Sequence, residues 1–401
     1  MTTGLTGVAV RARIPKVVPL LALSTFVLGT SEFMIAGLLP EIATDLRITI
    51  PQAGYLISAF AIGMIVGAPA MAVLTLRMPR RITLVAALVV FVAGHVLGAL
   101  AQDYTVMVVS RVVSAVATGA FWAVAGVVTV STVGPGDRAR ALSVLLAGLT
   151  VANVAGVPLG TLVGQQFGWR ASFWAVAALA GIGIVGVLVS VRNRDAAEPP
   201  LRIADEVAAF RRGRLWLALG TTALYQSGMI GAFSYIAPLL TDVAGLDTRW
   251  VPAVLLGFGV GALVGIIIGG RIADAHPWTS LLGALAAAAV LMCVVGLLAS
   301  IPVVVVVAEV LLGAIAFIAG APLNARVFAL AGDAPTLASA TNTSAFNVGN
   351  SLGPALGGIA ISLGLGYTAP SWLGAVLMGA AIVLALLSWR IDRRTGSGSS
   401  R

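Results

Sequence analysis

The chain has 401 residues, of which 59% are hydrophobic and only 10% are charged, and its mean hydropathy is +1.04. Soluble domains carry roughly 25% charged residues, so this composition excludes a soluble globular protein and indicates a membrane protein with many spans. A single cysteine, Cys293, excludes an intrachain disulfide and a cysteine cluster for zinc or iron–sulfur binding.

Twelve apolar segments follow one another along the chain, separated by turn and charge signals. The first follows basic residues as a signal peptide does, but it lacks a cleavage site, so we expect a retained first helix. Most connections are short, which predicts antiparallel neighbours. The predicted spans are Val17–Leu38, Ala53–Leu74, Thr83–Ala101, Thr105–Val128, Ala141–Val163, Ala171–Val191, Leu215–Leu239, Val251–Gly269, Ser280–Ala299, Val303–Phe328, Ala338–Ile361 and Pro370–Trp389.

The distribution of basic residues predicts the orientation. With the N-terminus placed in the cytoplasm, only three of the 24 basic residues fall in outer loops, namely Arg47, Arg170 and Arg249. Cytoplasmic loops of membrane proteins are enriched in Lys and Arg. We therefore expect a multi-pass protein of a cell membrane with both termini in the cytoplasm. The net charge of +9 is then a matter of orientation, and nucleic acid is not an expected partner.

The two parts of the chain resemble each other at a spacing of 198 residues. Pro40 then matches Pro238, Gly63 and Gly67 match Gly261 and Gly265, and Arg111 matches Glu309. The predicted fold is an all-α membrane protein of twelve transmembrane helices in two pseudo-symmetric six-helix halves, a build typical of transporters. The expected limits are 1–191 for the N-terminal half, 192–214 for a cytoplasmic linker, and 215–401 for the C-terminal half with a flexible tail.

Four ionisable residues lie well inside spans: Glu32, His95, Arg111 and Glu309. A charge in the membrane costs at least a few kcal/mol, so it usually faces a cavity or a partner. By helical rise each lies on the order of 10–12 Å below an outer helix end. We expect Glu32, Arg111 and Glu309 to meet around a central cavity and to couple proton movement to conformational change. The alternative is a fixed ion pair that only holds helices together. For His95 we expect packing.

Residues on the same helical faces are candidates to line that cavity. Mixed aromatic and amide side chains suit an amphipathic small molecule, although plain helix packing is the alternative for each of them. The candidates are Thr25, Gly29, Ser114, Thr118, Trp122, Thr222, Tyr225, Gln226, Asn342, Phe346 and Asn347.

At the level of motifs, the chain resembles the drug/proton antiporter branch of the major facilitator superfamily over its whole length. LGTSEFMIAGLLPEIA, from Leu28 to Ala43, resembles that branch's first-span signature, and Arg111 begins a segment similar to its span-4 motif. The opening of the chain is most similar to actinobacterial chloramphenicol-resistance exporters. The antiporter motif of span 5, with an echo in span 11, resembles the pattern formed here by Gly148, Gly156, Pro158, Gly160, Gly353 and Pro354.

Two departures from the family pattern stand out. The cytoplasmic loop after span 2 keeps the basic residues Arg77, Arg80 and Arg81, but Leu76 stands where the family has an acid. The equivalent loop after span 8 does keep Gly270 and Asp274, so the resemblance implies gate loops at both places. In span 5, Val157 separates Gly156 from Pro158, which the family pattern places side by side.

The resemblance implies export of a small amphipathic drug, chloramphenicol or a relative, in exchange for protons. A sugar, nucleoside or amino-acid derivative is the alternative cargo. Two histidines and one cysteine leave little for an enzyme to use, and no nucleotide-binding loop of the Walker type is present. We expect no cofactor and no metal. The expected partners are the drug, protons and the lipid bilayer of a bacterial cytoplasmic membrane, with the chain acting as a monomer.

Overall fold

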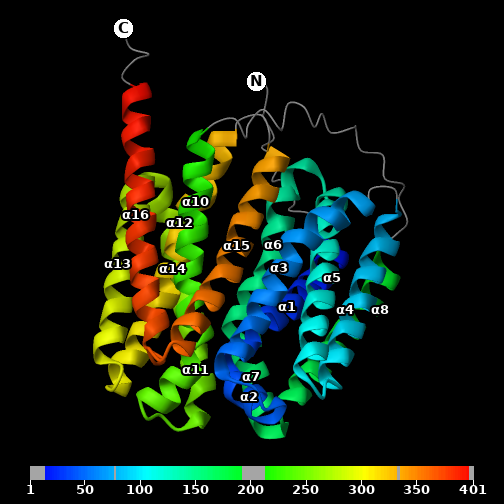
Figure 1. Cartoon of the computed structure of the whole chain (residues 1–401). Helices are drawn as coiled ribbons and strands as arrows, with labels where there is room; N and C mark the ends of the chain where they lie inside the picture. Colours follow the sequence, from blue (N-terminus) through cyan, green and yellow to red (C-terminus); the bar gives the residue numbers. More distant parts are fainter. Residues whose placement is uncertain (1–13, 76–77, 192–212, 332–334, 397–401) are drawn as a thin grey trace, which may run out of the picture.

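The computed structural model describes residues 14–75, 78–191, 213–331 and 335–396. Long helices stand side by side and run up and down through one bundle (Figure 1). Because the spans are even in number, α1 begins and α16 ends at the same end of the bundle, which we call the termini end. The opposite end is called the far end. The predicted linker lies almost wholly outside the described residues.

The first half contains six spans, and each agrees with its predicted segment to within a few residues. After the first span a 3-10 turn, Met34–Gly37, leads into the short helix α2 (Leu39–Leu46). The fifth span consists of two helices joined by a π-helical turn at Ala152–Gly156. The long helices are α1 (Val17–Phe33), α3 (Ile50–Leu74), α4 (Arg80–Ala99), α5 (Tyr104–Ser131), α6 (Arg138–Val151) with α7 (Val157–Phe167), and α8 (Trp169–Ser190).

The second half repeats this arrangement. Its first span is followed by a very short helix, α11 (Ile236–Pro238), and a π-helical turn at Leu239–Val243. Pro40 and Pro238 thus both lie just past the first span of their half. The long helices are α10 (Gly213–Ser234), α12 (Val251–Ala275), α13 (Pro277–Leu298), α14 (Pro302–Ala331), α15 (Pro335–Ser362) and α16 (Ala369–Gly396).

Among the described residues, ten helical segments are long and apolar enough to cross a membrane. The two remaining long helices, α10 and α15, have comparable lengths of 22 and 28 residues but carry more polar side chains. Helix α15 packs against both α10 and α3, so much of its surface faces other helices. Protein neighbours can satisfy polar groups that lipid cannot, and this accounts for the composition of these two spans.

Local signals explain where helices begin. At the start of α3, Thr49 and Gln52 form a capping box, in which Gln52 N donates to Thr49 Oγ1 and Thr49 N donates to Gln52 Oε1. At the start of α5, the carboxylate of Asp103 accepts from Val106 N at 3.0 Å. Both caps satisfy backbone donors that a helix leaves open at its N-terminus.

The glycine pairs of the repeat occupy equivalent places. A Cβ on Gly63 would lie 2.7 Å from Ala115 Cβ, so α3 packs closely on α5. A Cβ on Gly261 would lie 2.0 Å from the carbonyl oxygen of Val310, so α12 packs as closely on α14. These contacts seat the two helices that carry Arg111 and Glu309, and the pseudo-symmetry predicted from the 198-residue spacing is confirmed.

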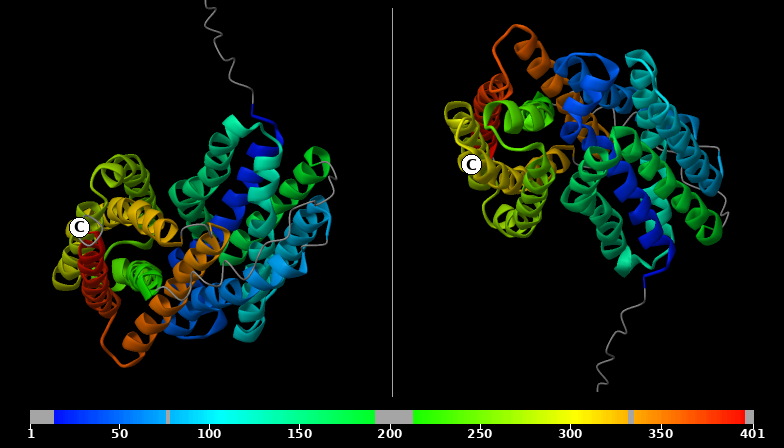
Figure 2. Two further views of the ribbon diagram at one scale, coloured as in Figure 1. Left: turned by 90° about the horizontal axis from the view of Figure 1, so that it is seen from above. Right: turned by 90° about the horizontal axis from the view of Figure 1, so that it is seen from below.

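The two halves form separate groups of helices when seen from above, with α15 reaching across between them (Figure 2). Contacts between the halves gather toward the far end. Gln165 of α7 donates to the Thr248 carbonyl at 3.1 Å, and Ser58 of α3 donates to the Ser351 carbonyl at 2.8 Å. A Cβ on Gly54 would lie 2.2 Å from the hydroxyl of Tyr235, which shows how closely α3 meets the second half there.

Candidate functional site

Glu32 lies in the last turn of α1, next to the break in the helix at Met34, and is half-buried. Asn350 of α15 donates from Nδ2 to Glu32 Oε1 at 3.2 Å. The other end of the Asn350 amide accepts from Gln226 Nε2 of α10 at 2.8 Å. A line of hydrogen bonds therefore runs from the carboxylate in the first half to two helices of the second half.

Arg111 of α5 is fully buried beside this carboxylate. It donates from Nη1 to Ser31 Oγ at 3.2 Å, and its Cζ lies 4.4 Å from the centroid of the Phe60 ring. Glu32 is near enough for an electrostatic interaction, but the ion pairs recorded among the described residues do not include this one. Two guanidinium nitrogens, Nε and Nη2, are buried without a hydrogen-bond partner among the described residues. The guanidinium is thus held through a hydroxyl rather than through the carboxylate.

His95 of α4 belongs to the same cluster, although the sequence suggested packing alone. Its Nε2 lies 2.7 Å from Ser31 Oγ and its Nδ1 lies 2.9 Å from the Phe91 carbonyl oxygen. Ser31 therefore touches both His95 and Arg111. The hydroxyl next to Glu32 in sequence was the signal that could have connected these residues.

Glu309 stands apart from this centre. It is buried in α14 of the second half, and no hydrogen bond or ion pair is recorded for it among the described residues. Helix α14, which carries Glu309, packs mainly on α12 and α13 of the second half. The structure thus brings Glu32 and Arg111 together but leaves Glu309 outside their hydrogen-bond network. The equivalence of Arg111 and Glu309 in the repeat puts them on matching helices of opposite halves.

Several expected lining residues are fully buried and pack within one half. A Cβ on Gly29 would lie 2.7 Å from the side chain of Leu149, and Thr25 donates back to the Leu21 carbonyl. Tyr225 donates to the Ala316 carbonyl of α14 at 2.6 Å. The hydroxyls of Thr118 and Thr222 also donate to backbone carbonyls of their own helices. Ser114 lies against Gly94 of α4.

Other candidates keep part of their surface or a polar atom free. Trp122, Gln226 and Phe346 are half-buried. The amide oxygens of Asn342 and Asn347 are buried without a partner in the described part of the chain. These residues and Glu32 are the candidates that have either partly exposed surface or a polar atom without a partner in the described part of the chain.

The span-5 motif forms a packed joint against α1. A Cβ on Gly148 would lie 2.1 Å from the Ala22 carbonyl oxygen, and a Cβ on Gly156 would lie 1.9 Å from Thr30 Oγ1. A Cβ on Gly160 would lie 3.3 Å from Met34 Cβ, on the same face of the span. All three glycines thus contact α1 or the turn that follows it, within their own half. Span 5 also meets the second half: Val154 of the π-helical turn approaches Gly259 of α12, and α7 packs on α12 as well.

The corresponding motif in span 11 lies between α15 and α10. A Cβ on Gly353 would lie 2.3 Å from the Ser227 carbonyl oxygen, and the carbonyl of Pro354 accepts from the Tyr235 hydroxyl at 2.7 Å. Helix α15 continues through Pro354 from Pro335 to Ser362. This motif too packs two helices of one half together.

The expected gate loops are described only in part. Arg81 at the start of α4 donates to the Leu188 carbonyl of α8 at 2.6 Å, and Arg80 lies beside it. Gly270 lies in α12, where a Cβ would meet nothing within 4 Å. Arg77 lies outside the described residues, and so does the side chain of Asp274.

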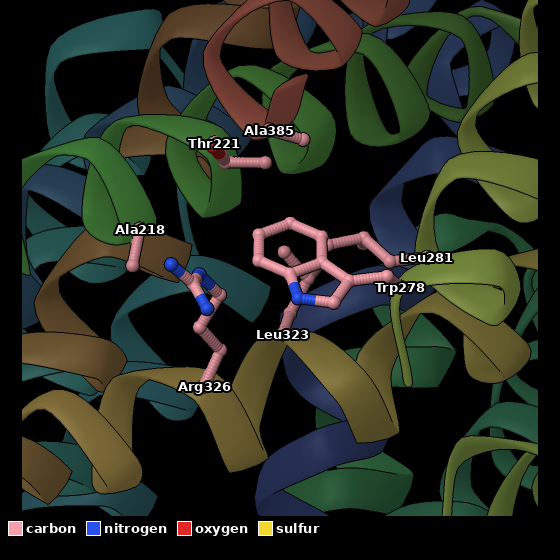
Figure 3. A pocket seen from close by; sticks show the side chains of 7 residues that line it. All are labelled: Ala218, Thr221, Trp278, Leu281, Leu323, Arg326 and Ala385. Carbon is pink, nitrogen blue, oxygen red and sulfur yellow. The ribbon is translucent and has the colours of Figure 1, made fainter. Parts of the chain in front are cut away.

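A second charged cluster lies near the termini end of the second half. Arg326 lies within α14, inside the predicted span Val303–Phe328. Its guanidinium lies 4.2 Å from the centroid of the Trp278 ring and pairs with Asp392 Oδ2 at 2.8 Å; Arg214 pairs with the other oxygen. Figure 3 shows Arg326 and Trp278 facing each other in an interstice that has no room for a water molecule. This cluster holds helices together.

Among the described residues no three His, Cys, Asp or Glu side chains are grouped as metal ligands. Two six-helix halves in a membrane, with a buried charged centre whose hydrogen bonds cross from one half to the other, have the build of a transporter that rocks its halves about a central site. A family model described as Major Facilitator Superfamily matches residues 21–344, and the chain belongs to that superfamily of membrane transporters. It is a transporter and not an enzyme.

Named relatives agree with this assignment. A chloramphenicol resistance protein of Streptomyces lividans is 41% identical, and the match covers 91% of this chain and 94% of that one. The inner membrane transport protein YdhP of Escherichia coli K12 is 39% identical over 94% of this chain and 97% of its own. A solved structure of a bacterial homolog to the human lysosomal transporter Spinster, inward-facing and occupied, has a TM-score of 0.75 at 17% identity, covering 93% and 96% of the two chains.

Proposed function

We propose that this transporter exports a small amphipathic drug, chloramphenicol or a relative, in exchange for protons. The observation that carries the proposal is the hydrogen bond from Asn350 to Glu32, which joins the two halves at a carboxylate inside the membrane. A group that can gain and lose a proton is thus part of the contact that must change when the halves rock.

The charge of Glu32 decides the strength of that contact. A hydrogen bond to a carboxylate is roughly twice as strong as one between neutral groups. Protonation of Glu32 therefore weakens the Asn350 contact and shifts the balance between two arrangements of the halves. Proton binding and conformational change are coupled in this way without any covalent step.

Arg111 provides the second part of the mechanism. Its Nε and Nη2 are unpartnered, so it can accommodate the Glu32 carboxylate, or an acceptor atom of the drug, once the Asn350 contact gives way. Because Nη1 is already bonded to Ser31, the guanidinium keeps its place in both situations. In this proposal the carboxylate alternates between Asn350 and Arg111 instead of staying in a permanent ion pair, and drug and proton compete for the same centre. Glu309, which matches Arg111 in the repeat, would contribute a buried carboxyl group to the second half, while the exchanged proton is carried by Glu32.

The cargo is proposed from the lining and from a relative. Trp122 and Phe346 offer aromatic surface, while Gln226, Asn342 and Asn347 offer amides for hydrogen bonding. Such a wall suits a molecule with an aromatic ring, hydroxyls and an amide, as chloramphenicol has. The Streptomyces lividans relative supports this cargo through its name. A sugar, nucleoside or amino-acid derivative is the alternative.

The orientation follows from the distribution of basic residues, with both termini in the cytoplasm of a bacterial cell. We take the halves as 1–191 and 215–401, and the chain as a monomer. The contacts that gather at the far end then close the outer side in the observed arrangement. The gate loops after spans 2 and 8, and the glycine motifs of spans 5 and 11, would serve the transition to the other arrangement.

The test is drug movement driven by a pH gradient. Purified protein is reconstituted in liposomes with an acidic lumen, so that protons leave as labelled chloramphenicol enters. Accumulation above the outside concentration, abolished by a protonophore, is the expected result. A panel with a sugar, a nucleoside and an amino-acid derivative runs in parallel. Equal chloramphenicol levels with and without the gradient would remove proton coupling, and accumulation of a panel compound alone would replace the cargo.

A further inference from the structure

His95 is enclosed at the centre of the first half. It is fully buried, and its ring lies 4.1 Å from the ring of Phe91 and 5.6 Å from that of Phe173, measured between centroids. Both ring nitrogens nevertheless have polar neighbours: the Phe91 carbonyl at Nδ1 and the Ser31 hydroxyl at Nε2. Ser114 Oγ lies 3.4 Å from Nδ1 as well.

The chemistry of these neighbours fixes where the protons are. A carbonyl oxygen only accepts, so Nδ1 of His95 carries a hydrogen directed at Phe91. A guanidinium only donates, so Arg111 Nη1 uses a lone pair of Ser31 Oγ. The Ser31 hydroxyl is then left to donate to Nε2 of His95, which accepts as part of a neutral imidazole.

A charged imidazole would disturb this arrangement. It would place two cations, His95 and Arg111, against one hydroxyl oxygen. The charged groups on the elements packed around the ring are Arg111 on α5 and Glu32 on α1, while α8 presents Phe173. The neutral form with hydrogen on Nδ1 satisfies every partner at once.

We infer that His95 is a positioning residue of the coupling centre, acting through Ser31. By accepting the Ser31 proton, it turns the hydroxyl lone pair toward Arg111 and so holds the guanidinium on α1, one residue away from Glu32. This keeps Arg111 from closing onto Glu32 as a fixed ion pair. The inference rests on the proposed function, since it assigns a role in the same proton-coupled exchange.

The variants separate the hydrogen bond from the packing. His95→Leu removes the acceptor, Ser31→Ala removes the hydroxyl, and His95→Gln keeps an acceptor oxygen at a similar reach. Phe173→Leu is the matched control, because it alters the packing around the ring and leaves the hydrogen bonds in place. The readout is the pH dependence of drug–proton exchange in the liposome assay.

Without the Ser31 anchor, Arg111 pairs with Glu32 directly and opposes its protonation. An opposite charge in contact shifts the titration of a carboxylate by about one to three pH units. His95→Leu and Ser31→Ala should therefore move the pH midpoint of exchange about one unit or more toward acid. His95→Gln should stay near the wild type, as should Phe173→Leu. An unmoved midpoint in His95→Leu, or an equal movement in Phe173→Leu, overturns the inference.

A second measurement does not depend on transport. The chain has only two histidines, His95 and His276, and His276 is exposed. Nitrogen NMR of histidine-labelled protein should show His95 neutral with hydrogen on Nδ1 between pH 5 and 8, with its Nε2 signal altered by Ser31→Ala. His276 is the internal control. A charged His95, or hydrogen on Nε2, refutes the inference, whereas failure of wild-type exchange alone refutes only the proposed function.

Discussion

Asn350 and Glu32 lie on opposite halves of the transporter, and the amide of one donates to the carboxylate of the other at 3.2 Å. The oxygen of the same amide accepts a hydrogen bond from Gln226 Nε2 of α10. The carboxylate is therefore tied to the second half by a hydrogen bond that weakens when Glu32 takes up a proton.

Replacing Asn350 should uncouple the two halves from the charge of Glu32. A hydrogen bond to a charged group contributes about 1.5–3 kcal/mol, so Asn350→Ala should reduce drug accumulation driven by a pH gradient by at least about tenfold. Drug binding measured by calorimetry should change less. Ser362→Ala on the same helix is the control and should transport normally, because its hydroxyl donates to the Gly358 carbonyl of its own helix. Full accumulation by Asn350→Ala would contradict this role.

The two carboxylates inside the spans, Glu32 and Glu309, should not be equivalent. Glu32→Gln keeps an acceptor for Asn350 but cannot exchange a proton, so it should bind drug and fail to accumulate it against a gradient. Glu309→Gln should retain gradient-driven accumulation, because Glu309 has no hydrogen bond to the opposite half in the described part of the chain. Proton release on addition of drug, followed with a pH dye in detergent, is measured for both variants. Release that survives in Glu32→Gln and vanishes in Glu309→Gln would reverse the assignment.

The glycine joint of span 5 should tolerate no added methyl group. Gly148→Ala places a Cβ 2.1 Å from a backbone oxygen of α1, so α1 and α6 must move apart. Overpacking of this kind costs about 1–3 kcal/mol, and we expect a lower Tm in detergent. Gly126→Ala on α5 is the matched control, since a Cβ there meets nothing within 4 Å. A Tm for Gly148→Ala equal to that of the control would show that the joint yields without cost.

The Arg326 cluster should matter for stability rather than transport. Asp392→Asn leaves Arg326 and Arg214 without their shared counter-charge. Breaking a buried pair costs about 3–5 kcal/mol, and we expect about 2 kcal/mol here because the side chain of Arg214 is 37% exposed. Asp247→Asn, whose partner Arg249 is 77% exposed, is the control and should cost about 0–1 kcal/mol. Chemical unfolding compares the two, and equal losses would speak against a stabilising cluster.

Glu41 on α2, outside the spans, should make stability depend on pH. Burial raises the pKa of its carboxyl above the ordinary 4.5, although hydrogen bonds from the backbone and from Gln165 lower it. The folded protein therefore favours the protonated form. The carboxyl therefore contributes to the free energy of unfolding in full below pH 4.5, and this contribution is lost as the pH rises through the raised pKa.

Glu41→Gln should consequently be more stable than the wild type at neutral pH, and the difference should vanish toward pH 4. Thermal unfolding of both proteins across this range measures it. Gln165→Ala should enlarge the pH dependence of the wild type, since it removes a hydrogen bond that favours the carboxylate. A difference between Glu41→Gln and wild type that is constant with pH would mean that the carboxyl does not titrate in this range.

The sequence by itself determined the spans, the repeat and the depth of the charges. The twelve apolar segments became twelve helical spans in the described part of the chain, because apolar length and backbone hydrogen bonding favour helices in lipid. The glycines at 63 and 261 could be matched because close packing of helices demands the smallest side chain at a fixed register. Glu32 and Arg111 could be singled out because charges inside spans are rare.

Only the tertiary structure decided which of these residues meet. Depth along a helix does not fix which partners a side chain has: Glu309 shares the depth of Glu32 and Arg111, yet no hydrogen bond or ion pair joins it to them among the described residues, and its place at a central cavity stays a prediction. His95 looked like packing because its partner, the Ser31 hydroxyl, sits on another helix 64 residues away. The residues joined by the hydrogen bond from Asn350 to Glu32 lie 318 positions apart, so no local sequence pattern could predict it. Hydrogen bonds between helices depend on how the helices rotate and cross, which is settled by the packing of the whole bundle.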